Sequence, residues 1–191
     1  VFLDIDANKV KSLEAQASKT AAGSVRGIVG TGDRIDVADA SADKVICTEV
    51  LEHVDNPTDV MAEMFRLGKP GAVYLITVPH DAGESMMQDA APPQYFQQPN
   101  HIRIFNEEQF RRLVCDTGLE ITHYEAFGAF WSIYFSIFWP SGDDFARPST
   151  PALVSWSKTW QAILNDENGA QIKEALNQAI PAKQLILARK P

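Results

Sequence analysis

With 191 residues, 45% of them hydrophobic, the chain is long enough to bury one sizeable core, and we predict a single domain. Its net charge of −8, with no basic run, argues against nucleic acid as a partner. The two cysteines lack metal-type spacing, and the longest apolar run, 127–139, is too short to span a bilayer. We therefore expect a cytoplasmic protein with reduced thiols and no membrane contact.

The first 30 residues predict a strand, a helix and a second strand. Residues 1–3 and 25–29 are short apolar runs, and residues 8–19 carry apolar side chains at helical spacing between them. Asp4 and Asp6 end the first strand, where an acidic side chain either contacts a ligand or caps the following helix. This order indicates a βαβ unit with parallel strands.

Residues 44–78 repeat this pattern. The apolar run 44–48 precedes Asn56 and Pro57, which are typical of a helix N-cap and of the first helical position. A helix with one apolar face follows, and residues 73–78 read as a second buried strand. Since ligands bind beyond the carboxyl ends of parallel strands, the polar residues just after each strand are candidate site residues.

Three motifs of this second unit carry a family resemblance: CTEVLEHVDNP, then GKPGA, then YLITVP. Together they resemble class I S-adenosylmethionine (SAM) dependent methyltransferases, especially the small-molecule branch that includes the ubiquinone and menaquinone methyltransferases. Ala72 replaces the last glycine of the family's KPGG pattern. The resemblance implies a Rossmann-like α/β fold, with a mostly parallel sheet, helices on both faces and an antiparallel last strand, 184–189, at the sheet edge. It also implies methyl transfer from SAM to a small organic acceptor by in-line displacement.

One family motif has no counterpart. The glycine-rich loop after the family's first strand is absent, and only eleven residues separate Gly32 from Lys44, too few for Gly30 and Gly32 to open the required helix. We therefore expect the first strand and helix of the family domain to be missing. Strands 1–4 and 44–48 are then either separated by a strand-wide gap, filled by preceding residues or by a partner chain, or paired directly with each other. The alternative is a methyltransferase-like module that binds or assembles without catalysis. A nicotinamide-dependent dehydrogenase is disfavoured because no GxGxxG opens a helix.

The resemblance implies six cofactor contacts, at Asp4, Ile5, Asp33, Arg34, Thr48 and Glu49. Asp4 matches the acidic residue that accepts both ribose hydroxyls, and Asp6 is the second choice for this role. Asp33 and Arg34 match the step beside the adenine, although Asp33 also fits a simple turn. Thr48 and Glu49 would lie beside the methionine part.

The acceptor side of the site is predicted from two later segments. Residues 81–105 read as an irregular lid or substrate loop. His101 and His80 are the candidate catalytic bases, with Tyr95 and His53 as further candidates. Residues 128–180 read as a helical insertion before the last strand. Its aromatic start, 128–139, is either core or a dimer contact that would make the protein a homodimer, or else a cap over an apolar acceptor or a patch that touches membrane lipid. The four histidines are scattered, so the sequence pattern indicates no metal site.

Overall fold

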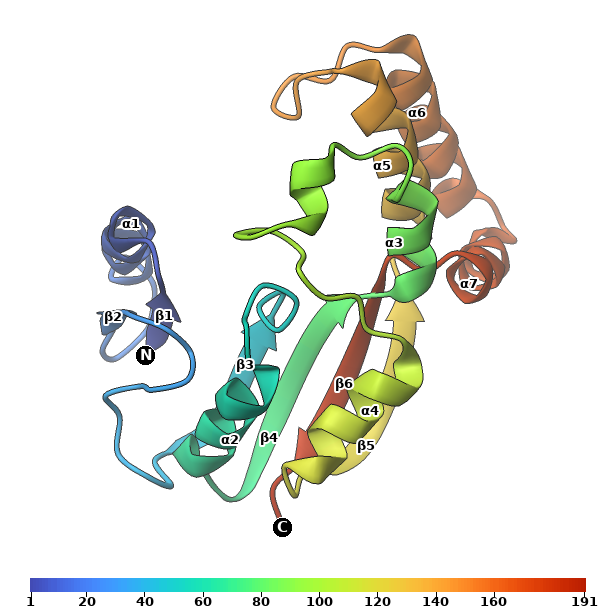
Figure 1. The fold of residues 1–191 in the computed structure, drawn as a ribbon. Helices are drawn as coiled ribbons and strands as arrows, with labels where there is room; N and C mark the ends of the chain where they lie inside the picture. Colours follow the sequence, from blue (N-terminus) through green and yellow to red (C-terminus); the bar gives the residue numbers. More distant parts are fainter.

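The computed structural model describes the whole chain, residues 1–191, as an α/β protein with two separate β-sheets (Figure 1). The elements in chain order are β1 (Phe2–Asp4), α1 (Ala7–Ala17), β2 (Gly27–Val29), β3 (Ala42–Thr48), α2 (Pro57–Leu67), β4 (Gly68–Pro79), α3 (Asp81–Met87), the 3-10 helix η1 (Pro93–Phe96), α4 (Glu107–Asp116), β5 (Glu120–Phe127), α5 (Ala129–Ser141), α6 (Pro151–Asn165), α7 (Gly169–Ala179) and β6 (Lys183–Arg189).

The first βαβ unit forms as predicted, as a small body of its own. β1 and β2 pair in parallel, with Phe2 opposite Gly27, and α1 packs on them through the buried Val10. Gly27 is required by this packing, because a Cβ there would lie 2.5 Å from the side chain of Val10. Asp6 caps α1, with its carboxylate accepting from the backbone N–H groups of Asn8 and Lys9.

The second sheet has the strand order β3-β4-β6-β5. β3 and β4 pair in parallel, whereas β6 is antiparallel to both β4 and β5, so that β3, β4 and β5 all run in one direction. The antiparallel last strand is confirmed, but its expected place at the sheet edge is wrong. Every second side chain of β6, including Gln184 and Ile186, is buried. In its place between β4 and β5, the backbone N–H and C=O groups of this buried strand find hydrogen-bond partners on both sides.

The main core lies between this sheet and the helices α2 and α4, which cover one of its faces (Figure 1). The N-cap at Asn56 and the capping box of Asn106 with Gln109 form at the two helix starts where the sequence predicts them. The other face of β3 is open, and 70% of Ile46 is exposed there.

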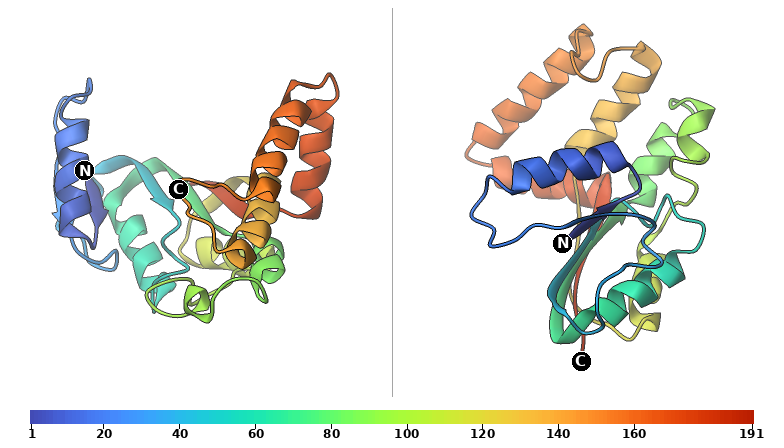
Figure 2. Two further views of the ribbon diagram at one scale, coloured as in Figure 1. Left: turned by 90° about the horizontal axis from the view of Figure 1, so that it is seen from above. Right: turned by 90° about the vertical axis from the view of Figure 1, so that its left-hand side faces the viewer.

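β1 and β3 share no ladder, so of the two arrangements left open by the sequence, direct pairing of these strands is excluded. The unit of β1, α1 and β2 stands to one side of the four-stranded sheet in Figure 1 and in the left view of Figure 2, and the segment 30–41 connects them. On the opposite side, α5, α6 and α7 project from the sheet (Figure 2). None of the helices combines the length and apolar character needed to cross a membrane.

Residues 81–100 are more regular than the predicted loop. α3 forms there because His80 acts as its N-cap and because Gly83 and Glu84 are buried against the rest of the protein. A Cβ at Gly83 would lie 2.8 Å from the Cα of Ala182, so the helix packs closely on the segment before β6. A β-bridge between His80 and Phe105 ties the two ends of the segment together.

Candidate functional site

Five polar side chains meet beyond the carboxyl end of β3. Glu52 and His53 follow β3, Glu84 lies on α3, Tyr95 on η1, and His101 in the segment that returns to α4. The rings of His53 and His101 have centroids 5.0 Å apart, and those of Tyr95 and His101 are 4.5 Å apart. We call these five residues the acid–histidine cluster.

Glu84 is the internal anchor of the cluster. Its side chain is almost fully buried, and its carboxylate accepts from the Tyr95 hydroxyl at 3.1 Å and from His101 Nδ1 at 3.2 Å. Burial lowers the pKa of His101, but the hydrogen bond and charge of Glu84 outweigh it, so the pKa of His101 is raised. Burial and the nearby Glu84 charge also raise the pKa of Tyr95, which keeps its hydroxyl protonated as a donor.

Glu52 is fully buried, and neither oxygen of its side chain has a hydrogen-bond donor among the protein groups. The nearest cationic candidate is His53, whose Nε2 lies 3.6 Å from Glu52 Oε1. Burial raises the pKa of Glu52 to about 7. Such an unsatisfied buried carboxyl group is rare in protein interiors and marks this position as one with a further interaction.

The helical insertion approaches this cluster through its aromatic residues. The ring of Trp139, near the end of α5, lies 5.4 Å from that of Tyr95, and its buried Nε1 has no acceptor. Behind it, α5 and α6 form a small apolar core around Tyr134, Phe138 and Leu153. The aromatic stretch is therefore partly core and partly the wall next to the cluster.

His80 lies at the other end of the segment and has a different role. Its Nδ1 accepts from the backbone N–H of Ala82 at 3.1 Å and also lies 2.8 Å from an oxygen of Asp81. These contacts need opposite protonation of Nδ1. Burial lowers the pKa of His80, which favours the neutral, capping form. The structure thus places this predicted base at a helix cap, outside the cluster.

The two predicted cofactor residues at the end of β3, Thr48 and Glu49, differ in exposure and in hydrogen bonding. Thr48 is exposed at the strand end, whereas both oxygens of Glu49 are engaged. Oε1 accepts from the Thr77 hydroxyl at 2.9 Å, and Oε2 lies 2.9 Å from Lys183 Nζ. Glu49 also adopts a left-handed backbone conformation, with φ of 55°, which marks the sharp turn out of β3.

The predicted ribose and adenine residues lie on the separate N-terminal unit. Asp4 ends β1, and its Oδ1 accepts from the Asp6 N–H at 2.8 Å, while Ile5 is 71% exposed. Asp33 and Arg34 lie exposed in the turn after β2. No hydrogen bond or ion pair joins these residues to Thr48 or Glu49.

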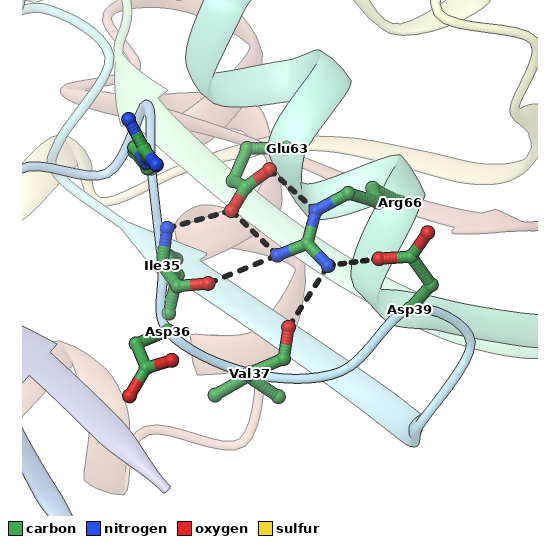
Figure 3. A pocket seen from close by; sticks show the side chains of 7 residues that line it. Ile35, Asp36, Val37, Asp39, Glu63 and Arg66 are labelled. Carbon is green, nitrogen blue, oxygen red and sulfur yellow. Dashed lines mark hydrogen bonds and ion pairs between the residues drawn. The ribbon is translucent and has the colours of Figure 1, made fainter.

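The turn that holds Asp33 and Arg34 continues into a tightly fixed loop, residues 35–39 (Figure 3). Arg66 on α2 donates to the carbonyl oxygens of Ile35 and Val37 at 2.9 and 2.8 Å. It also forms two bonds of 2.7 Å with Glu63, whose carboxylate in turn accepts from the Ile35 N–H at 2.6 Å. These residues line a polar hollow on the surface, and the bonds attach the loop to α2.

The comparisons with known proteins agree with this arrangement of strands and helices. A family model described as a methyltransferase domain matches residues 4–124, more than half of the chain. The chain belongs to the methyltransferase domain family. The class I SAM-dependent resemblance is thus confirmed, whereas its ubiquinone and menaquinone branch stays a prediction.

Individual relatives of this methyltransferase-family chain share 30% or less of its sequence in the matched regions. A protein of Mycolicibacterium smegmatis, named as a probable SAM-dependent methyltransferase, is 30% identical over 83 residues, which are 44% of this chain and 30% of that protein. The chain thus spans about a third of this relative's length. A SAM-dependent methyltransferase from Mesorhizobium loti superposes with a TM-score of 0.60 and 14% identity, over 98% of this chain and 78% of that one.

A solved structure with another activity shares this fold. It is a [4+2]-cyclase, with a TM-score of 0.59 and 16% identity over 99% of this chain and 64% of that one. At such identities the likeness establishes the Rossmann-like fold alone.

Sequence reasoning missed two members of the cluster. Glu52 lies inside the EVLEHV motif, but the motif served only to recognise the family, and the strand-end rule pointed to Thr48 and Glu49. Glu84 was hidden because residues 81–100 read as an irregular loop, in which a buried carboxylate is not expected. His101 was identified, as the group next to the acceptor.

Proposed function

We propose that the protein transfers the methyl group of SAM to a small organic acceptor bound at the acid–histidine cluster. The observation that carries the proposal is the position of the cluster, beyond the carboxyl end of β3 and below an aromatic wall. Membership of the methyltransferase domain family supports the reaction type.

The residues of the N-terminal unit fit the nucleoside end of SAM. Asp4 uses Oδ1 internally, which leaves Oδ2 to accept from a ribose hydroxyl. The exposed turn at Asp33 and Arg34 offers a carboxylate and a backbone N–H to the adenine edge. Each Glu49 oxygen has one partner, the Thr77 hydroxyl or Lys183 Nζ, and keeps a second lone pair that can accept from the SAM ammonium group. When bound, SAM supplies a sulfonium methyl group whose transfer leaves a neutral thioether.

The chain's own contribution is to hold the acceptor in line and to accept its proton. A hydroxyl acceptor needs lone pairs that can receive the proton, and the cluster offers the Glu52 oxygens and the histidine nitrogens that Glu84 does not engage. Positioning alone can supply a large part of the acceleration of such a displacement. The Trp139 and Tyr95 rings favour an acceptor with a flat apolar body, such as a phenol or catechol.

The test uses the full-length protein and measures the release of S-adenosylhomocysteine with a panel of phenols, catechols, aliphatic alcohols and amines. We expect turnover with hydroxylated aromatic compounds and at least tenfold less in His101→Ala. His123→Ala is the matched control, because the His123 side chain lies exposed on β5 and its one ionic partner is Glu125, at 3.6 Å. Calorimetric SAM binding without turnover on any acceptor would refute the proposal and favour the non-catalytic module.

A further inference from the structure

Three metal-type donor groups converge within the acid–histidine cluster. Glu52, His53 and His101 each offer one donor atom, and these atoms all lie within 4.8 Å of one another. Two imidazoles with one carboxylate form a donor set that suits zinc, manganese, iron or cobalt. The three residues come from two segments of the chain that meet only in the folded protein, the turn after β3 and the segment before α4.

A second observation is independent of this convergence. Both Glu52 oxygens are fully buried and accept no hydrogen bond from the protein. A buried carboxylate is normally paired with a cation, hydrogen-bonded or coordinated to a metal. His53 does not satisfy it, since a separation of 3.6 Å is too long for a hydrogen bond and would leave the second oxygen without any partner.

The outer contacts of both histidines are those of metal ligands. His53 Nδ1 lies 3.1 Å from the backbone carbonyl oxygen of Pro99, and His101 Nδ1 lies 3.2 Å from the Glu84 carboxylate. Both partners are acceptors, so each Nδ1 carries the hydrogen and each Nε2 keeps its lone pair. Metal-binding histidines characteristically donate their other N–H to a carbonyl or carboxylate in this way.

We propose that Glu52, His53 and His101 bind one divalent transition-metal cation, with Glu84 as the positioning residue for His101. Three protein ligands leave coordination positions open for an oxygen of a small molecule. His53 is one-third exposed and provides the route from solvent. The rest of the cluster is closed by Tyr95, whose hydroxyl satisfies the second oxygen of Glu84.

The role of the cation rests on the proposed function. A hydroxyl oxygen of the acceptor binds the metal, and the lowered pKa of the bound group releases its proton to solvent. The oxygen lone pair then forms the new bond to the methyl carbon, while the bond between that carbon and sulfur breaks and its electron pair stays on sulfur. In the metal-bound protein the two histidines are therefore ligands, and the cation replaces them in activating the hydroxyl.

The experiment titrates Zn²⁺, and separately Mn²⁺, into the chelator-dialysed full-length protein by calorimetry, without SAM or acceptor. We expect one site per chain. Glu52→Gln, which keeps the side-chain shape, and His101→Ala should lose at least tenfold in affinity, and Glu84→Gln roughly 10–100-fold. His123→Ala, which removes an exposed histidine beside a glutamate, should bind like the wild type.

A spectroscopic measurement on the wild type keeps the test independent of variant folding. Electron spin-echo spectra of the Mn²⁺-loaded protein should contain imidazole nitrogen couplings. No binding of either cation, equal losses in the cluster variants and in His123→Ala, or bound Mn²⁺ without nitrogen couplings would each overturn the site. Metal binding with methyl transfer that is unchanged after chelation would overturn the catalytic role. Because the titration contains no SAM, failure of the metal site leaves the methyl-transfer proposal standing.

Discussion

Replacing Arg66 by methionine should both destabilise the protein and weaken its hold on the adenosine part of SAM. The guanidinium connects α2 to the loop 35–39 through Glu63, the carbonyl oxygens of Ile35 and Val37, and Asp39 (Figure 3). Methionine preserves the apolar stem but removes all of these donors. The loop directly follows Asp33 and Arg34, so its release also frees the turn proposed to contact the adenine.

The magnitude follows from how exposed each partner is. Asp39 is 78% exposed, so its ion pair with Arg66 contributes only about 0–1 kcal/mol. The two bonds to backbone carbonyls contribute roughly 0.5–1.5 kcal/mol each. Glu63 is only 11% exposed, and its carboxylate would lose its cation in a partly buried place, which adds about 1 kcal/mol. We expect a total loss of about 3 kcal/mol in the free energy of unfolding.

Urea unfolding of the full-length protein measures this loss as a fall in the midpoint of roughly 1–2 M, with an unchanged slope. Arg66→Lys should recover less than half of it, because lysine cannot form the bidentate contact with Glu63. The control is Arg26→Met, which removes a surface ion pair with the 94% exposed Asp36 and should cost less than about 1 kcal/mol. Equal midpoints for Arg66→Met and Arg26→Met would refute the reasoning.

Asp4→Ala should weaken SAM binding, measured by calorimetry, roughly ten- to hundredfold. Asp6→Ala should keep the affinity but lower the free energy of unfolding by about 1 kcal/mol, because it removes the N-cap of α1. The reverse pattern would exchange the roles of the two residues. The hydrogen bond with Arg66 lowers the pKa of Glu63 below 4.5. Its stabilising effect is thus present above about pH 4.5 and lost as the pH falls through the folded-state pKa, so the stability difference between wild type and Glu63→Gln should shrink from about pH 7 to about pH 3. Gln184→Leu leaves two buried backbone carbonyls without their donor and should cost about 1–3 kcal/mol in urea unfolding, and an unchanged midpoint would argue against this bond.

The sequence alone determined the family and most local elements, but not the helices within residues 81–100. Helix caps at Asn56 and Asn106 depend on contacts two or three residues away, so they can be identified from spacing without knowledge of the fold. The same holds for the two parallel βαβ units, since a single helix between two short strands is typical of a parallel pair. The missing motif left open whether β1 and β3 pair directly, and the tertiary structure decided that they do not.

Only the tertiary structure decided which polar groups meet. Glu52 and His101 lie 49 positions apart in the sequence, and no local periodicity relates them. His80 and His101 looked alike as loop histidines, yet packing makes one a helix cap and joins the other to Glu84. The buried, unpartnered state of Glu52 could not be inferred either. Burial and hydrogen bonding depend on chain segments that come together only when the sheet and its surrounding helices have formed.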